Sequence, residues 1–217
     1  MTSTETREVA TPEGPGRLHL SLPDRVRGVL LLGGGHSGQV RTVDLDAVAA
    51  ELPGHGWLVA RYELPWRVAG RTVGPRPPTS DPAWSAGVDA VRAAWPGVPL
   101  VTGGRSAGAR IACRTWDAAL TGILTLSFPL HPPGKPAQSR LGELTPVGVP
   151  VLLVSGARDP FGTPAEFEAA LAEPHAGPRD LVVVDGATHS FPRSSAARVV
   201  AAVVEFVGRH GSDSAPV

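Results

Sequence analysis

Cysteine and lysine are almost missing from the sequence. Cys113 is the only cysteine, so no disulfide can form within the chain, as expected for a protein of a reducing compartment. Lys135 is the only lysine, and the 20 basic residues are balanced by 20 acidic ones, which leaves a formal net charge of +0. A neutral chain lacks the bulk attraction for anionic polymers and lipid surfaces. We therefore expect neither nucleic acid nor a membrane as a partner.

Long apolar segments are also missing. No run approaches the ~20 residues of a membrane-spanning helix, and residues 1–16 lack the apolar core of a secretory signal. These two absences predict a cytoplasmic location. Residues 1–16 and 211–217 are polar and are expected to be disordered tails. The 217-residue chain has the length of one ordinary domain, which we expect over residues 17–210.

The chain does contain an alternation of short apolar runs with helical patterns. Several runs are continuous in Val and Leu, which is typical of parallel strands buried on both faces. The first run alternates and predicts an antiparallel edge strand. The order predicts an α/β fold with a mostly parallel sheet of about seven strands and helices on both faces. The expected strands are residues 17–22, 28–33, 57–64, 99–104, 122–128, 150–156 and 180–186, and the expected helices are residues 40–51, 84–95, 107–119, 164–172 and 194–209.

Two long segments lie between these elements. Residues 65–83 are rich in Pro, Arg and Gly, and residues 129–146 are rich in Pro. Long loops in compact domains are often functional. Neither segment is long enough to fold by itself, so we expect no separate lid domain.

The strongest local motif is Gly-Arg-Ser-Ala-Gly at residues 104–108, which matches G-x-S-x-G. It follows an expected strand and precedes an expected helix, as a nucleophile on a sharp strand-to-helix bend requires. Glycines flank such a bend because larger side chains would clash with the neighbouring strand and helix. The motif predicts Ser106 as a nucleophile, although the same glycines also suit an ordinary strand-to-helix turn.

A serine hydroxyl reacts when a base takes its proton, and that base is oriented by a carboxylate. In this architecture the order along the chain is serine, acid, histidine. Asp159 and His189 each follow an expected strand, at the sheet edge where ligand sites of α/β folds form. We therefore predict that Ser106, Asp159 and His189 form a catalytic triad. The alternatives are a turn-forming Asp-Pro dipeptide, an ordinary histidine, and Asp185 as a rival acid.

A glycine-rich loop at residues 33–38, Gly-Gly-Gly-His-Ser-Gly, follows the second expected strand. It satisfies G-x-G-x-x-G, but a dinucleotide site needs an acidic residue about 20 positions further on, and Glu63 lies too far along the chain. No Gly-Lys-Ser/Thr follows for a phosphate-binding loop. In this position the loop supplies an oxyanion-hole donor, so we predict donation from the backbone of Gly35 and His36 together with the Ala107 N–H. The alternative is a tight turn without a ligand.

Metal-ligating side chains occur near the same loops. His36, His131, His189 and Asp159 are candidates by type, but no two of these histidines have a short metal-ligand spacing. We therefore predict no metal and no other cofactor. A nicotinamide oxidoreductase stays an alternative through the glycine motif alone.

The segments GVLLLGGGHSG, VTGGRSAGARIACR, LSFPLHPPGKP, LLVSGARDPFG and GATHSF are spread along the chain between the two tails. In them the sequence resembles compact α/β-hydrolase-fold proteins of the dienelactone-hydrolase-like clan. It is most similar to the alpha/beta family hydrolase group that includes the Tex-type proteins and a subunit of a histone acetyltransferase complex. The resemblance implies Ser106 as nucleophile, Asp159 as acid and His189 as base. The glycine loop departs from it, since Gly34 stands in place of a usual histidine and His36 in place of a small residue.

Dienelactone hydrolases proper carry a cysteine at the nucleophile position, where this chain has a serine. Cys113 falls inside the following helix and is expected to be a small core residue. The predicted nucleophile is therefore a hydroxyl rather than a thiol.

Together these residues predict a serine hydrolase that acts on carboxylic esters or related acyl compounds. Without a lid domain the pocket should be open, which favours small soluble acyl substrates over long lipids. From their positions in loops, Trp66, Pro129, Leu130, His131 and Phe161 are expected to form its walls. Because some relatives are subunits of assemblies, the alternative is a non-catalytic binding or scaffold protein. The sequence leaves open whether the chain is a monomer or a homodimer.

Overall fold

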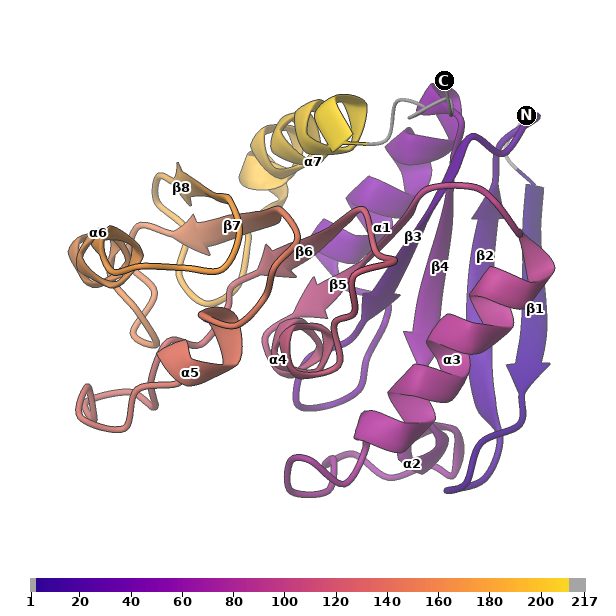
Figure 1. The fold of residues 1–217 in the computed structure, drawn as a ribbon, viewed down its shortest axis with the longest axis horizontal. Helices are drawn as coiled ribbons and strands as arrows, with labels where there is room; N and C mark the ends of the chain where they lie inside the picture. The colour runs from indigo at the N-terminus through magenta and orange to yellow at the C-terminus, as the bar shows by residue number, and fades with distance from the viewer. Residues whose placement is uncertain (1–2, 211–217) are drawn as a thin grey trace.

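The structure is a computed structural model that describes residues 3–210 (Figure 1). Its centre is an eight-stranded sheet with the strand order β1-β2-β4-β3-β5-β6-β7-β8. β1 and β2 run antiparallel to their neighbours, and all pairings from β4 to β8 are parallel. The strands are β1 (Ser3–Val9), β2 (Gly16–Leu22), β3 (Gly28–Gly33), β4 (Trp57–Glu63), β5 (Leu100–Arg105), β6 (Gly122–Leu126), β7 (Val151–Gly156) and β8 (Arg179–Val184).

Helices cover both faces of this sheet. α1 and α7 pack on one face, and α3 and α4 pack on the other (Figure 1). The helices are α1 (Val43–Glu51), α2 (Pro65–Val68), α3 (Asp81–Ala94), α4 (Ala107–Arg114), α5 (Leu141–Leu144), α6 (Pro164–Ala172) and α7 (Ala196–His210), with single 3-10 turns at Leu52–His55 and Arg193–Ser195. Within residues 3–210, none of them is both long and apolar enough to cross a membrane.

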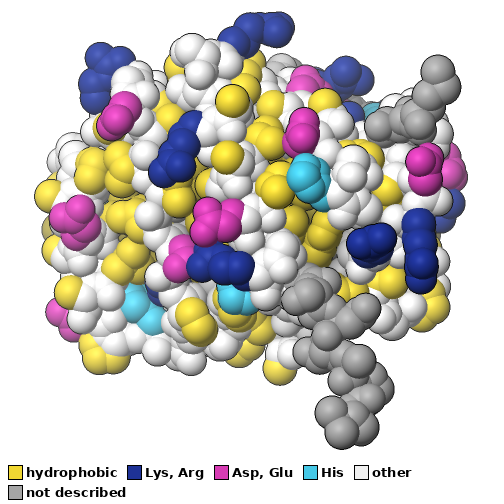
Figure 2. Space-filling view, turned by 90° about the horizontal axis from the view of Figure 1, so that it is seen from above, with side chains coloured by type: hydrophobic (Ala, Val, Ile, Leu, Met, Phe, Trp, Pro, Cys, Tyr) yellow, Lys and Arg dark blue, Asp and Glu magenta, His cyan; other side chains and the backbone are white. Residues whose placement is uncertain are grey.

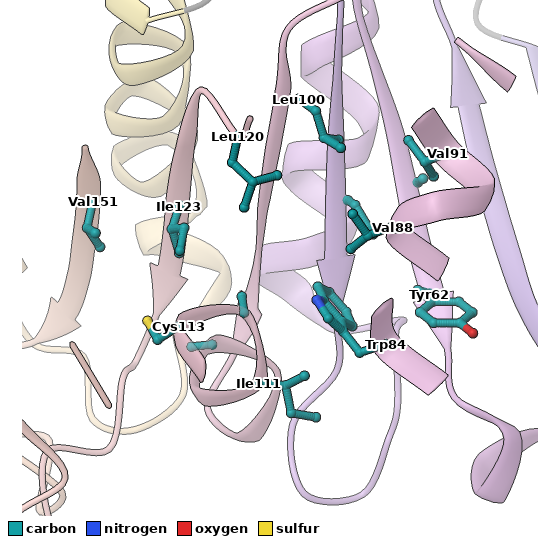
Figure 3. Packing of buried hydrophobic residues seen from close by; sticks show 14 of the residues in the cluster. Tyr62, Trp84, Val88, Val91, Leu100, Ile111, Cys113, Leu120, Ile123 and Val151 are labelled. Carbon is teal, nitrogen blue, oxygen red and sulfur yellow. The ribbon is translucent and has the colours of Figure 1, made fainter. Parts of the chain in front are cut away.

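The continuous apolar strands bury side chains on both faces. In β3, Leu31 packs in the cluster that includes α3 and α4, whereas Leu30 and Leu32 pack in the cluster that includes α1 and α7. Figure 3 shows part of the first cluster, in which the rings of Tyr62 and Trp84 lie 6.0 Å apart between their centroids. Because successive side chains of a strand point to opposite faces, a sheet with two covered faces requires an unbroken apolar run.

The prediction of a disordered tail is wrong for residues 3–9, which form β1. This strand pairs with β2 along its whole length, from Ser3 opposite Leu22 to Val9 opposite Gly16. Only Val9 is buried, because β1 is the edge strand and its other side chains are exposed. The strand carries almost no apolar signal, and backbone hydrogen bonds hold it to the sheet. The sheet therefore has eight strands rather than about seven, and β2 lies one position in from the edge.

The two long segments contain short helices of their own. Residues 65–83 include α2 and the start of α3, and residues 129–146 include α5. Neither forms a separate lid domain, as predicted. The helix expected over residues 107–119 ends earlier, at Arg114. The tail predicted at residues 211–217 lies outside the part of the chain that the structure describes.

Surface charge is mixed. On the face seen in Figure 2, basic and acidic side chains are interspersed with apolar ones, and neither sign gathers into a large patch. This agrees with the balanced composition of 20 basic and 20 acidic residues. The face in this view therefore offers no strong attraction to a polyanion.

Candidate active site

Ser106 is the single residue between β5 and α4. Its backbone φ is 51° and its ψ is −105°, a conformation that non-glycine residues rarely adopt. The flanking glycines make the bend possible, because a Cβ at Gly104 would lie 2.5 Å from the carbonyl oxygen of Gly33. A Cβ at Gly108 would lie 2.7 Å from the same oxygen. The bend therefore holds a serine in a strained conformation, which commonly marks a functional residue.

His189 and Asp159 form a hydrogen-bonded line with Ser106. The ring Nε2 of His189 lies 2.9 Å from the Oγ of Ser106. The ring Nδ1 lies 2.8 Å and 3.0 Å from the two carboxylate oxygens of Asp159. The three residues follow β5, β7 and β8, so the fold brings them to the carboxyl ends of three parallel strands. In this arrangement a proton can pass from the hydroxyl to the imidazole, while the carboxylate stabilises the imidazolium that results.

Exposure differs along this line. The side chain of Asp159 is 0% exposed, whereas that of His189 is 20% exposed. One carboxylate oxygen of Asp159 also accepts the backbone N–H of Phe161 at 2.9 Å. The ring of Phe161 packs against the imidazole with centroids 4.1 Å apart. The carboxylate is thus fixed inside the protein, while the imidazole keeps contact with solvent.

The glycine-rich loop that follows β3 lies beside the serine. A Cβ placed on Gly35 would be 3.8 Å from the Cβ of Ser106. The N–H of Gly108 donates to the carbonyl of Gly34 at 3.0 Å, and the N–H of Gly38 donates to the carbonyl of Gly35 at 2.8 Å. The first hydrogen bond ties the loop to the first turn of α4, and the second closes a turn within the loop.

The N–H groups of Gly35, His36 and Ala107, beside the serine bend, are among those that donate to no backbone carbonyl within residues 3–210. Ala107 is the first residue of α4, so its N–H has no acceptor in the helix. Gly34 also accounts for the unusual sequence of this loop, because a Cβ there would overlap the backbone of Gln39. A histidine at position 34 would not fit this loop conformation.

A cleft of about 300 Å³ opens next to these N–H groups. One wall is a face of α4, to which Ala107, Arg110, Ile111 and Arg114 belong. The opposite wall comes from the end of β4 and the segment after it, and includes Tyr62, Leu64, Trp66, Val73, Pro75, Arg76 and Pro77. The cleft therefore borders the serine bend through Ala107 and the glycine loop, although Ser106 itself is not among the lining residues, and its lining is largely apolar.

Two of the predicted wall residues lie in different parts of the site. Trp66 lines the cleft, and its ring lies so close to Gly38 that a Cβ on that glycine would overlap it. Phe161 is not among the residues that line the cleft, and it contacts the imidazole of His189 instead. Trp66 thus belongs to the cleft, whereas Phe161 belongs to the surroundings of the base.

The other three predicted wall residues lie behind the acid loop and not in the cleft lining. Leu130 is 5% exposed and packs in the hydrophobic core rather than in the lining of this cleft. His131 is buried as well. Its backbone N–H donates to the carbonyl of Phe161 at 3.0 Å, and its ring Nε2 lies 3.2 Å from a carboxylate oxygen of Glu166. Pro129 precedes them in the same segment, which supports the loop that carries the acid rather than the substrate pocket.

Sequence reasoning missed several residues of the cleft. Arg110, Ile111 and Arg114 share a helix face with Ala107, so the helical periodicity after the G-x-S-x-G motif contained the signal. Tyr62 lies at the cleft end of β4, where its hydroxyl donates to the carbonyl of Ala83 at 3.0 Å and burial raises its pKa.

Cys113 is a core residue, as predicted. It is 0% exposed, and burial raises the pKa of its thiol to about 12. A thiol in this state is unreactive at neutral pH. Among residues 3–210, no group of three or more His, Cys, Asp or Glu side chains is placed to hold a metal ion.

The strand order, the helices on both faces and the serine bend after a central strand are those of the α/β-hydrolase fold. The sequence agrees with this class, because residues 26–204 match the model of the family described as "Alpha/beta hydrolase domain". The chain belongs to the alpha/beta hydrolase family. No curated protein matches the sequence.

Solved structures with this fold are similar over almost the whole chain. Dienelactone hydrolase from Anabaena variabilis has a TM-score of 0.79 and 18% identity, with 96% of this chain and 98% of that chain covered. XC6422 from Xanthomonas campestris, a member of the a/b serine hydrolases without a lid, has a TM-score of 0.75 and 19% identity over 99% and 98%. The Pyrococcus furiosus esterase Pf2001 has a TM-score of 0.76 and 17% identity over 97% and 94%. At these identities the similarity establishes the fold.

Proposed function

We propose that this protein is a serine hydrolase that cleaves carboxylic esters of small acyl groups. The observation that carries the proposal is the hydrogen-bonded line Ser106–His189–Asp159 at a strained bend, beside unpaired backbone N–H groups. Membership in the alpha/beta hydrolase family supports it.

In the first half of the reaction, the Oγ of Ser106 attacks the carbonyl carbon of the ester and its proton moves to Nε2 of His189. The tetrahedral intermediate collapses, the bond to the alcohol oxygen breaks, and the imidazolium returns the proton to the leaving alcohol. In the second half, water attacks the acyl-enzyme, with His189 again taking and returning the proton. The products are a carboxylic acid and an alcohol, and the enzyme is regenerated.

Asp159 acts on the base rather than on the substrate. Its buried carboxylate accepts the Nδ1–H of His189, which fixes the tautomer that leaves Nε2 free to accept the serine proton. The same contact stabilises the positive charge that the ring carries in the intermediate. The Asn variant of this residue would keep the shape but present the wrong hydrogen-bonding pattern.

The oxyanion of the intermediate lies between the serine bend and the glycine loop. The N–H of Ala107 is one donor, and the backbone of Gly35 and His36 supplies the other. Donors of this kind each contribute about 2.7–4 kcal/mol of transition-state stabilisation. The positive end of the α4 dipole adds to the stabilisation because Ala107 is the first residue of that helix.

The size of the cleft supports a small acyl substrate. Its volume of about 300 Å³ is at the lower end of ligand pockets, which span ~300–1,000 Å³. Tyr62, Leu64 and Trp66 provide apolar surface for the acyl group. Among residues 3–210 no lid domain covers the cleft, which gives small soluble esters access from solvent.

A fluorophosphonate probe tests the proposal. We expect it to label the wild-type protein, and we expect Ser106→Ala to abolish both the labelling and the hydrolysis of short-chain esters. Ser85→Ala, which changes an exposed serine on α3, is the matched control and should behave as wild type. Absence of labelling in the wild type, or labelling that persists in Ser106→Ala, would contradict the proposal and favour a non-catalytic role.

A further inference from the structure

Arg105, the residue before the serine, connects the nucleophile bend to the loop of the base. Its side chain is 16% exposed. One guanidinium nitrogen, Nη2, donates to the backbone carbonyl of His189 at 2.7 Å and to the hydroxyl of Ser190 at 2.6 Å. Within residues 3–210, nothing else donates to that carbonyl. The position of His189 therefore depends on a side chain that starts next to Ser106.

A buried carboxylate lies on the other side of the same guanidinium. Nε of Arg105 is 3.3 Å from Oδ2 of Asp44, whose side chain is 2% exposed in the first turn of α1. The Thr42 hydroxyl donates to the other oxygen of Asp44, and Oδ2 has no hydrogen-bond donor among the described residues. Arg105 is thus the cation that compensates a buried negative charge, and such a charge is costly without a partner.

The glycine loop also lies against this guanidinium. A Cβ placed on Gly35 would be 3.3 Å from Nη1 of Arg105. One planar group therefore contacts α1, the loop with the oxyanion donors and the loop with the base. The fork geometry of arginine permits these contacts together, whereas the single ammonium group of lysine would not reproduce them.

We propose, on the basis of the proposed function, that Arg105 is a positioning residue for His189, with Asp44 as its buried counter-charge. It holds the backbone of the base loop so that Nε2 of His189 stays at hydrogen-bond distance from Ser106. Arg105 is not among the residues that line the cleft, and it bonds to the backbone of His189 rather than to the side chains of the hydrogen-bonded line. Its removal should therefore affect turnover more than substrate binding.

A purely structural ion pair would give a different result, and a pair of variants separates the two. Arg105→Met leaves the Asp44 charge buried without a partner, so the melting temperature should fall. The double variant Arg105→Met/Asp44→Asn removes both charges and should recover much of the lost melting temperature. In that double variant we still expect kcat to be about 10- to 100-fold lower than in the wild type, with KM within about twofold of the wild-type value. The reason is that a small displacement of a catalytic group greatly lowers the rate of the chemical step.

Two further variants complete the kinetic test. Arg105→Lys keeps the positive charge but lacks the planar, multi-donor guanidinium. Compared with Arg105→Met, it should recover more of the melting temperature than of kcat. Arg92→Met breaks the Arg92–Asp117 ion pair, 2.7 Å long and remote from the serine, and should leave kcat unchanged. Recovery of kcat together with melting temperature in the double variant would overturn the positioning role.

Proton NMR of the histidine rings gives a readout that does not depend on esterase activity. The Nδ1–H of His189, held by Asp159, should give a low-field signal in the wild type. The signal should shift or broaden in Arg105→Met/Asp44→Asn but not in Arg92→Met. An unchanged signal in the stable double variant would refute the proposal. Failure of the proposed function would instead appear as an unlabelled, inactive wild type.

Discussion

The two sides of the candidate site are held in place by different kinds of contact. The glycine side, residues 33–38 and 104–108, is fixed by backbone atoms that approach so closely that added Cβ atoms would clash. The histidine side, residues 157–163 and 185–192, also has backbone hydrogen bonds, such as that from the N–H of Arg158 to the carbonyl of Ala187, but its carboxylate and imidazole are oriented by side-chain hydrogen bonds to each other. Close packing tolerates little added volume, whereas a side-chain hydrogen bond can be removed by itself.

This difference separates stability from chemistry. A substitution on the glycine side should damage the fold and the activity together, because the same backbone contacts serve both. A substitution on the histidine side should damage the activity while the sheet and its two cores stay intact. Three substitutions, one on each side and one behind the acid loop, test how far this separation holds.

The largest effect is expected on the histidine side. His189→Gln removes the base and should lower kcat for ester hydrolysis by about 10⁴-fold or more. The melting temperature should stay close to that of the wild type, because the side chain is 20% exposed and takes no part in the core. Steady-state kinetics and thermal melting measure the two quantities. His55→Gln, at an exposed histidine after α1, is the control and should change neither. A large loss of melting temperature in His189→Gln would remove the distinction between the two sides.

A smaller effect, on stability, is expected on the glycine side. Gly104→Ala places a Cβ 2.5 Å from the carbonyl oxygen of Gly33, in a backbone with φ of +156°. We expect a loss of about 1–3 kcal/mol in the free energy of unfolding, with activity lost in parallel. Urea denaturation measures this loss. Gly142→Ala on α5, where a Cβ meets no atom within 4 Å, should be neutral or slightly stabilising. Wild-type stability combined with lost activity in Gly104→Ala would show that backbone packing does not fix the bend.

The sequence contains most of the information about the glycine side and the central strands. An unbroken Val/Leu run such as residues 28–33 indicates a strand that is buried on both faces. The glycines around Ser106 indicate a bend that larger side chains would not permit. The order of serine, acid and histidine places all three at one end of the sheet once the strands are parallel. Local patterns were sufficient in these cases because each feature follows from a short motif or from the order of the parallel strands.

Features made by distant residues were not predictable in the same way. β1 forms because it pairs with β2, and its exposed side chains carry no pattern. Leu130 was assigned to the pocket from its loop position, but the side chains of a loop can point to the core or to solvent, and here it points to the core. The contact of Arg105 with Asp44 joins β5 to α1, and no local sequence pattern in either segment predicts it.

The smallest effect is expected behind the acid loop, at His131. The carbonyl of Pro132, which accepts from the ring at 2.8 Å, raises the pKa of His131, and the Glu166 carboxylate adds to this. Because the folded state favours the protonated ring, its contribution to stability is fully present below the ordinary pKa of about 6.5. That contribution is lost as the pH rises through the raised value.

The difference in melting temperature between the wild type and His131→Gln should therefore be larger at about pH 5.5 than at about pH 9. The Glu166 side chain is 38% exposed, so solvent screening keeps this ion pair within the ~0.2–1 kcal/mol of surface pairs. This corresponds to a few degrees at most for a chain of this length. Thermal melts of both proteins over this pH range measure the difference. A pH-independent difference would mean that the ring supports the acid loop by packing alone, and the histidine side would then be less dependent on hydrogen bonds than its contacts indicate.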